Sequence, residues 1–186
     1  MTDKDKDLKS FLTRLRVARL LAASTNDIPV WRTVRRKGLE RLLDAPGLRM
    51  SSNVRLDRSH PELGGRLVLG RDVEIGPRCI LDISGGITIE DGVTVSEDSL
   101  LLSHDHNFQD ADTHWRVQGK VARPLVIGHG AWIGARSTVL GATQSIGEGA
   151  VVGACSLVTK PIERMALAMG APATVRRYRT SAREQQ

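Results

Sequence analysis

The chain has few aromatic side chains and no long run of apolar residues. Three Trp, two Phe and one Tyr make up only 3% of the 186 residues, whereas hydrophobic residues make up 40%. That hydrophobic fraction supports a packed core. A core nearly without rings has to be built from Val, Ile, Leu and Ala, which suit a narrow interior. The length favours one domain with attached segments.

Cysteines and targeting segments are equally scarce. Cys79 and Cys155 are too few for a disulfide-stapled scaffold, and we expect Cys79 to lie in the core. Residues 1–9 are charged and lack the apolar stretch of a signal peptide. No apolar run approaches the roughly 20 residues that a membrane span needs. The sequence therefore predicts a cytoplasmic protein without a transmembrane segment, and leaves peripheral membrane attachment open.

Basic residues gather at the two ends of the sequence, within a net charge of +6. Basic ends favour an anionic partner, which includes nucleic acid, a membrane surface or a phosphorylated cofactor. No basic patch interleaved with aromatic residues and no nucleic-acid-binding motif occurs, so we expect no nucleic-acid partner.

A six-residue spacing of aliphatic side chains dominates the middle of the chain. Four triplets share this step: Leu69, Ile75 and Leu81; Ile89, Val95 and Leu101; Ile127, Ile133 and Val139; Ile146, Val152 and Val158. A compact residue often follows four positions later, and Gly often follows directly. No α-helix repeats every six residues, but a solenoid of short parallel strands does. The pattern predicts an all-β solenoid in which three units close one triangular coil and the aliphatic residues point inward.

The interruptions of the repeat predict where the chain leaves the coils. The step from Leu101 to Ile127 is twenty-six residues, so a long loop at 103–124 must leave the prism. Loops on a rigid scaffold are where function concentrates. We therefore divide the chain into a helical segment at 1–47, an entry segment at 48–66, the β-helix at 67–160 and a tail at 161–186. Helical spacing predicts helices over residues 3–23 and 29–43, and we expect a terminal helix from Ala173.

The excursion loop opens with Ser-His-Asp-His-Asn at residues 103–107. Histidine exchanges a proton near neutral pH, and a neighbouring carboxylate or carbonyl can fix its tautomer. The cluster predicts a general base at the root of the loop. A polar loop with incidental histidines is the other reading.

Three further strings complete a resemblance to a known family. They are IGHGAWIGA at 127–135, VGACSLVTK at 152–160 and GAPATVRR at 170–177. Together with the repeat and the histidine loop, they resemble the left-handed β-helix acyltransferases, among them the galactoside, maltose, streptogramin and surface-polysaccharide O-acetyltransferases. The resemblance implies a left-handed β-helix and a homotrimer with each active site between adjacent prisms. It also implies transfer of an acetyl group from acetyl-CoA to a hydroxyl of a sugar or glycoside.

Site residues follow from the resemblance. It makes His104 the general base, with His106 as the alternative, and a general base typically contributes 10²–10⁴-fold. Asp82 stands where relatives often place an Asn that faces the acceptor, and Asp105 and Trp132 join it as acceptor-contacting residues. The implied coenzyme A contacts are Trp132, Ala135, Ala154, Thr159, Lys160, Arg176 and Arg177. Guanidinium groups recognise phosphates bidentately. Pro161 departs from the acidic residue that relatives carry after the Lys.

Two other classes stay open at this point. The string Gly-His-Gly-Ala at 128–131 resembles part of the signature of the zinc-dependent gamma carbonic anhydrases, with His104 and His106 nearby in sequence. That signature needs a further His about five residues after His129, where Gly134 stands, so we expect no metal. The other class is a non-catalytic scaffold whose N-terminal helices recruit a partner. The acceptor, and acetyl against a longer acyl group, are left open.

Overall fold

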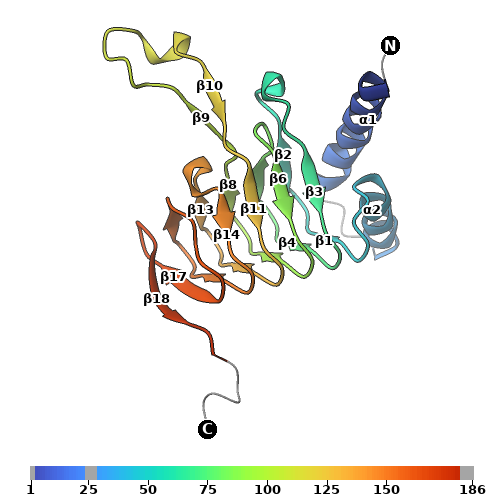
Figure 1. Ribbon diagram of the computed structural model, residues 1–186. Helices are drawn as coiled ribbons and strands as arrows, with labels where there is room; N and C mark the ends of the chain where they lie inside the picture. Colours follow the sequence, from blue (N-terminus) through green and yellow to red (C-terminus); the bar gives the residue numbers. More distant parts are fainter. Residues whose placement is uncertain (1–2, 24–28, 181–186) are drawn as a thin grey trace.

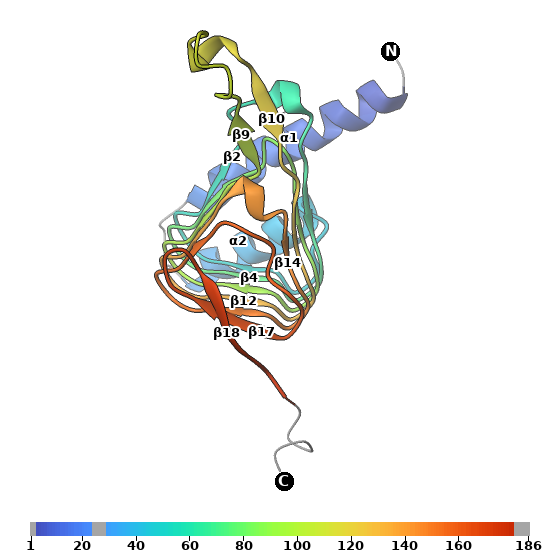
Figure 2. The same ribbon diagram turned by 60° about the vertical axis from the view of Figure 1, so that its left-hand side comes forward.

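The computed structural model describes residues 3–23 and 29–180 and consists of a stack of parallel coils with two helices at one end (Figure 1). Three parallel sheets surround a common axis (Figure 2). The first sheet contains β1 (Arg49–Met50), β4 (Glu74–Ile75), β7 (Thr94–Val95), β12 (Trp132–Ile133), β15 (Val151–Val152) and β17 (Ala166–Met169). The second contains β2 (Arg55–Asp57), β5 (Ile80–Asp82), β8 (Leu100–Leu101), β13 (Thr138–Val139) and β16 (Leu157–Val158). The third contains β3 (Leu67–Leu69), β6 (Ile87–Ile89), β11 (Leu125–Ile127) and β14 (Ser145–Ile146).

The six-residue repeat builds the core as predicted. Equivalent aliphatic residues pair across successive coils, as Leu69 with Ile89 and Ile89 with Ile127 do in the third sheet. All twelve repeat positions are buried. Because one coil buries little apolar surface by itself, stacking of these side chains holds the solenoid together. Cys79, at a compact position, is also buried as expected.

The solenoid is longer than the predicted range of 67–160. Strands β1 and β2 lie inside the entry segment and pair in parallel with β4 and β5. Their inward residues, Met50 and Leu56, are six apart and buried. The sequence hides this coil because a single six-residue step, from Met50 to Leu56, is followed by a gap of thirteen residues to Leu69. At the other end, β17 pairs in parallel with β15 and extends the first sheet to Met169.

The expected helix from Ala173 is wrong for the described residues. Strand β18 (Thr174–Tyr178) turns back and pairs antiparallel with β17. Thr174, Val175 and Tyr178 are β-branched or aromatic and favour strands. The last coil also offers an unpaired strand edge, which β18 fills. Residues 181–186, the rest of the expected helix, lie outside the described part of the chain.

The two helices that the sequence predicts cover the first coil. Helix α1 (Asp3–Ala23) and helix α2 (Pro29–Leu42) pack against each other and against β1 and β2. Arg35 of α2 is only 8% exposed and donates hydrogen bonds to the carbonyls of Leu21 and Met50. Its guanidinium therefore ties both helices to the coil. No helix among residues 3–23 and 29–180 combines the length and apolarity needed to cross a bilayer.

The chain leaves the coils where the repeat is interrupted. Strands β9 (His104–His106) and β10 (Lys120–Ala122) form an antiparallel hairpin that projects from the stack (Figure 1). The tip of the hairpin carries the short helix η2 (Trp115–Val117). Two more short helices, η1 (Pro61–Leu63) and η3 (Gly141–Thr143), contact its base. The structure confirms the excursion and places its root beside the corners of three other coils.

Candidate active site

The root of the hairpin holds a carboxylate–imidazole pair. Asp82 ends β5 and His104 begins β9, and the register of β5 with β8 pairs Leu81 with Leu101. The chain that continues past β8 therefore passes directly over Asp82. His104 Nδ1 lies 2.5 Å from Asp82 Oδ2. When Nδ1 carries the proton of this hydrogen bond, Nε2 keeps its lone pair and is available to accept a proton.

Asp82 is buried and fully engaged within the chain. Its side chain accepts hydrogen bonds from the Ser84 hydroxyl at 2.6 Å, the Ser84 amide at 3.1 Å and the Ser103 amide at 3.2 Å, besides the one from His104. Burial to 4% exposure works to raise the pKa of Asp82, but the bonds from Ser84, His104 and Ser103 outweigh it and lower that pKa below its ordinary value of 3.8. Asp82 is therefore ionised at neutral pH. Its contribution to folding is complete above its unfolded-state pKa and is lost as the pH falls through the lower folded-state value.

Backbone contacts fix the residue before the histidine. The Ser103 hydroxyl donates to the Asp82 carbonyl at 2.5 Å and accepts from the Gly85 amide at 2.9 Å. The Ser103 carbonyl accepts from the Arg123 amide at 2.7 Å, which joins both ends of the excursion. A Cβ on Gly85 would lie 1.7 Å from that carbonyl oxygen, so only glycine permits this approach. These contacts fix the backbone that carries the His104 imidazole.

A third histidine, His60, lies beside the two predicted ones. Its ring centroid is 4.6 Å from that of His104 and 5.6 Å from that of His106. The His60 amide donates to the Ser84 hydroxyl at 3.2 Å, and its Nδ1 lies 3.4 Å from Glu62 Oε1. Sequence analysis missed His60 because it falls in the unassigned entry segment. The pairing of β2 with β5 places Asp57 beside Asp82. The segment with His60, which follows β2, therefore lies at the same corner as Ser84, which follows β5.

His106 and Asp105 lie along the hairpin. The His106 ring meets Trp115 edge to face, with ring centroids 5.7 Å apart. The Asp105 carboxylate accepts a hydrogen bond from the His106 amide at 2.8 Å. The structure thus places both predicted residues next to His104, whereas Asp82 lies beneath it.

The predicted coenzyme A contacts fall into separate groups. Ala135 and Ala154 precede strands of the second sheet and lie in adjacent coils, where the Cys155 amide donates to the Ala135 carbonyl at 2.8 Å. Thr159 and Lys160 follow the last strand of the same sheet, along the corner that carries His104. Parallel strands of the second sheet therefore separate the two alanines from the base.

Trp132 and the two arginines belong to the first sheet. Trp132 is 50% exposed on β12, and its indole N–H donates to the Ser96 hydroxyl at 2.9 Å. Arg176 and Arg177 are exposed on β18, at the end of that sheet. One copy of the chain does not bring these side chains to His104.

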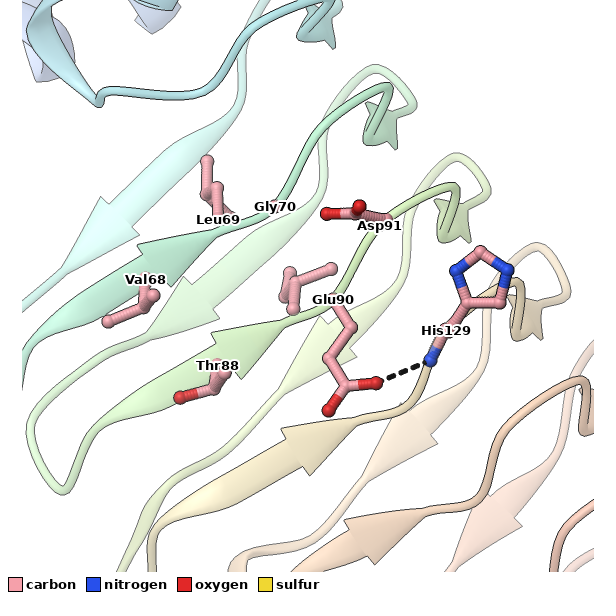
Figure 3. Close-up of a pocket in the computed structure, with 8 residues that line it drawn as sticks. Val68, Leu69, Gly70, Thr88, Glu90, Asp91 and His129 are labelled. Carbon is pink, nitrogen blue, oxygen red and sulfur yellow. Dashed lines mark hydrogen bonds between the residues drawn. The ribbon is translucent and has the colours of Figure 1, made fainter.

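His129 lies apart from the three clustered histidines. It borders a recess of about 360 Å³ on the third sheet, lined by Val68, Leu69, Gly70, Thr88, Ile89, Glu90 and Asp91 (Figure 3). The His129 amide donates to Glu90 Oε2 at 2.8 Å. Among the residues that the structure describes, the histidines close enough to share one ion are His60, His104 and His106. The zinc set suggested by the sequence, with His129, is not assembled within one copy.

Comparisons with known proteins agree with this architecture. Residues 66–96 and 124–160 match the family model "Hexapeptide repeat of succinyl-transferase". A Mycobacterium tuberculosis protein named "Probable acetyltransferase Rv3034c" is 33% identical over 124 residues, which are 67% of this chain and 39% of that protein. The chain thus spans well under half the length of that relative.

Solved structures share the fold. A maltose O-acetyltransferase from Clostridium difficile 630 superimposes with a TM-score of 0.72 and 22% identity, covering 94% of this chain and 88% of that one. The N-acyltransferase AntD from Bacillus cereus gives a TM-score of 0.62 and 19% identity, covering 73% and 71%. The chain carries the hexapeptide repeat, is similar in sequence to proteins named as acetyltransferases, and shares the fold of these solved acyltransferases.

Proposed function

We propose that the protein transfers an acetyl group from acetyl-CoA to a hydroxyl of a sugar or glycoside, with His104 as general base. The observation that carries the proposal is the 2.5 Å contact between His104 Nδ1 and Asp82 Oδ2 at the root of the hairpin. A buried carboxylate that holds one ring nitrogen leaves the other to work as a base. A non-catalytic scaffold has no need of such a pair.

His104 Nε2 takes the proton of the acceptor hydroxyl as that oxygen attacks the thioester carbonyl carbon. The new C–O bond forms, the C–S bond breaks, and the imidazolium returns its proton to the departing thiolate. The products are an O-acetyl ester and free coenzyme A. Both substrates have to reach Nε2 together, since no covalent enzyme intermediate takes part.

Asp82 acts in this proposal as a positioning residue beneath His104, in place of the acceptor contact suggested by the resemblance. Its two oxygens already receive hydrogen bonds from Ser84, Ser103 and His104. The carboxylate selects the tautomer with the proton on Nδ1 and stabilises the imidazolium that forms during transfer.

Asp82→Asn is expected to lower kcat by roughly 10²-fold or more, with little change in KM for the acyl donor, because the amide can donate to Nδ1 and reverse the tautomer. Steady-state kinetics and ¹⁵N NMR of the His104 ring measure the two effects. Asp91→Asn, which removes an exposed carboxylate paired with Arg71, is the control. A kcat within twofold of the unaltered protein, or an unchanged tautomer, contradicts this role.

Support for the acyl donor comes from the fold neighbours. AntD was crystallised with dTDP and 3-hydroxybutyryl-CoA. Exposed Arg176 and Arg177 offer guanidinium groups for phosphates, and the half-exposed Trp132 ring offers an apolar face to the pantetheine arm. We also infer that the coils of this protein wind in the left-handed sense, as they do in the acyltransferases that its sequence resembles. The choice of a sugar hydroxyl rests on the name of the maltose O-acetyltransferase neighbour, and the cytoplasmic location stays a prediction.

We also propose a homotrimer in which adjacent copies complete each site. Ala135 and Ala154 precede strands of the second sheet, whereas His104 follows a strand of that sheet. The flat face of the second sheet therefore separates the predicted coenzyme A contacts from the base within one copy. Two copies side by side bring the His104 corner of one to the alanine corner of the next. Closed rings of identical subunits use such head-to-tail contacts.

Mixed trimers test the shared site. His104→Ala and Ala154→Trp should each be inactive alone, since one lacks the base and the other blocks the donor. Co-expression in equal amounts should restore about a quarter of the active sites, because random assembly pairs two intact halves at that frequency. Co-expressed differently tagged copies of His104→Ala are the control. Absence of recovery in verified mixed trimers refutes the shared site.

A screen of acceptors tests the function itself. Purified protein with acetyl-CoA is offered mono- and disaccharides, glycosides and amino sugars, and thiol release is followed together with mass analysis of the acceptor. We expect a mass gain of one acetyl group on a hydroxyl-bearing sugar. Thiol release only with amines would redirect the proposal to N-acetylation. No binding of coenzyme A and no turnover would favour the scaffold.

A further inference from the structure

We propose that His60, His104 and His106 form a binding site for a divalent transition-metal ion of the zinc class. One ligand atom from each of the three side chains lies within 4.8 Å of the others. Neutral imidazole is the commonest metal ligand in proteins, and three histidines with an open fourth position form an established donor set for zinc.

The backbone directs all three rings to one point. His104 and His106 are two residues apart on β9, so their side chains leave the strand on the same side. His60 arrives from the corner after β2, and its centroid is 4.6 Å from that of His104. Tetrahedral coordination at about 2.0 Å separates ligand nitrogens by about 3.3 Å. Side-chain adjustments on the order of an ångström would close the cluster around an ion.

Two of the three histidines already have the outer partners that metal ligands usually carry. Asp82 accepts the hydrogen bond from His104 Nδ1, so Nε2 is the ring nitrogen left to bind an ion. Glu62 Oε1 lies 3.4 Å from His60 Nδ1, and Lys120 Nζ donates to the same oxygen at 3.2 Å. Carboxylates behind ligating imidazoles fix their orientation and raise their basicity.

The ion and the acceptor hydroxyl compete for the same lone pair. If His104 is the base, as the proposed function holds, an ion on Nε2 blocks proton transfer. The site therefore acts as a reversible zinc-sensitive brake on the enzyme, distinct from a metal that the reaction needs.

Metal binding is tested on the full chain without reference to activity. Isothermal titration with Zn²⁺, and visible spectroscopy with Co²⁺ as a probe, should show one ion per chain. His60→Ala and His106→Ala should each weaken the affinity on the order of 100-fold, while His129→Ala, a histidine outside the cluster, should leave it unchanged. Circular dichroism confirms that each variant is folded. Equal Zn²⁺ affinity in folded His60→Ala and the unaltered protein overturns the proposal.

Inhibition separates this inference from the proposed function. Zn²⁺ should reduce acetyl transfer, a chelator should restore it, and the inhibitory concentration should rise at least tenfold in His60→Ala, each variant being compared with its own uninhibited rate. Specific metal binding in a protein with no transferase activity supports the site and removes the proposed function. Transfer that Zn²⁺ does not inhibit, in a protein without stoichiometric binding, overturns the site alone.

Discussion

His104→Ala is expected to lower kcat for acetyl transfer by about 10²–10⁴-fold, the usual contribution of a general base. The loss arises because, among the three clustered histidines that the structure describes, His104 is the one whose ring is hydrogen-bonded to a buried carboxylate. Steady-state assays of thiol release with the best acceptor measure this loss in kcat. Binding of coenzyme A and the circular dichroism spectrum should stay unchanged, since the His104 side chain belongs to the hairpin and not to the core.

His106→Ala is the comparison that decides between the two histidines of the sequence motif. His106 contacts Trp115 and has no carboxylate on its ring comparable to Asp82. We therefore expect its replacement to cost much less in kcat than that of His104. An unchanged rate in His104→Ala, or a larger loss in His106→Ala, removes His104 from the role of base.

Gly85→Ala is expected to destabilise the protein by roughly 4 kcal/mol or more, in the range reserved for severe core or backbone disruption. The added methyl group would stand 1.7 Å from the Ser103 carbonyl oxygen and 2.8 Å from the Arg123 amide nitrogen. Neither atom can retreat without breaking the hydrogen bond that joins the two ends of the hairpin. Chemical denaturation monitored by circular dichroism gives the change in unfolding free energy.

Gly64→Ala is the matched control for this substitution. Nothing lies within 4 Å of a Cβ built on Gly64, but its φ of +73° disfavours any L side chain. The control therefore carries only backbone strain, about 1–2 kcal/mol. If both variants lose the same stability, steric exclusion at Gly85 is not what holds the root of the hairpin.

The core was predictable from the sequence because the repeat is a local signal. Residues such as Ile89 and Ile127 reveal their stacking by their place in the repeat, and the break between Leu101 and Ile127 reveals that a long loop leaves the coils, though not that it forms a hairpin. The first coil escaped notice because Leu56 and Leu69 are thirteen residues apart, which breaks the repeat after one step. The strand at Thr174–Tyr178 escaped because it pairs with the edge that the last coil presents at β17, and residue spacing does not reveal that edge.

The candidate site was predictable only in part. His104 and His106 lie in one recognisable string, so sequence reasoning found them. The partnership of Asp82 with His104 depends on the register between β5 and β8, and the approach of His60 depends on a coil that was not assigned. Contacts between corners of successive coils are long-range, and spacing within one segment does not reveal them.

The first and last coils of the stack are each covered by a segment that is not part of the repeat. A bare parallel coil exposes a row of amide and carbonyl groups onto which further chains can add without limit. Here the helices α1 and α2 cover one terminus of the spiral, and at the other the arginine-bearing strand β18 reverses direction beside β17. The helices at the first coil and the reversed strand β18 at the first-sheet edge of the last coil therefore both work against the addition of further coils along the axis.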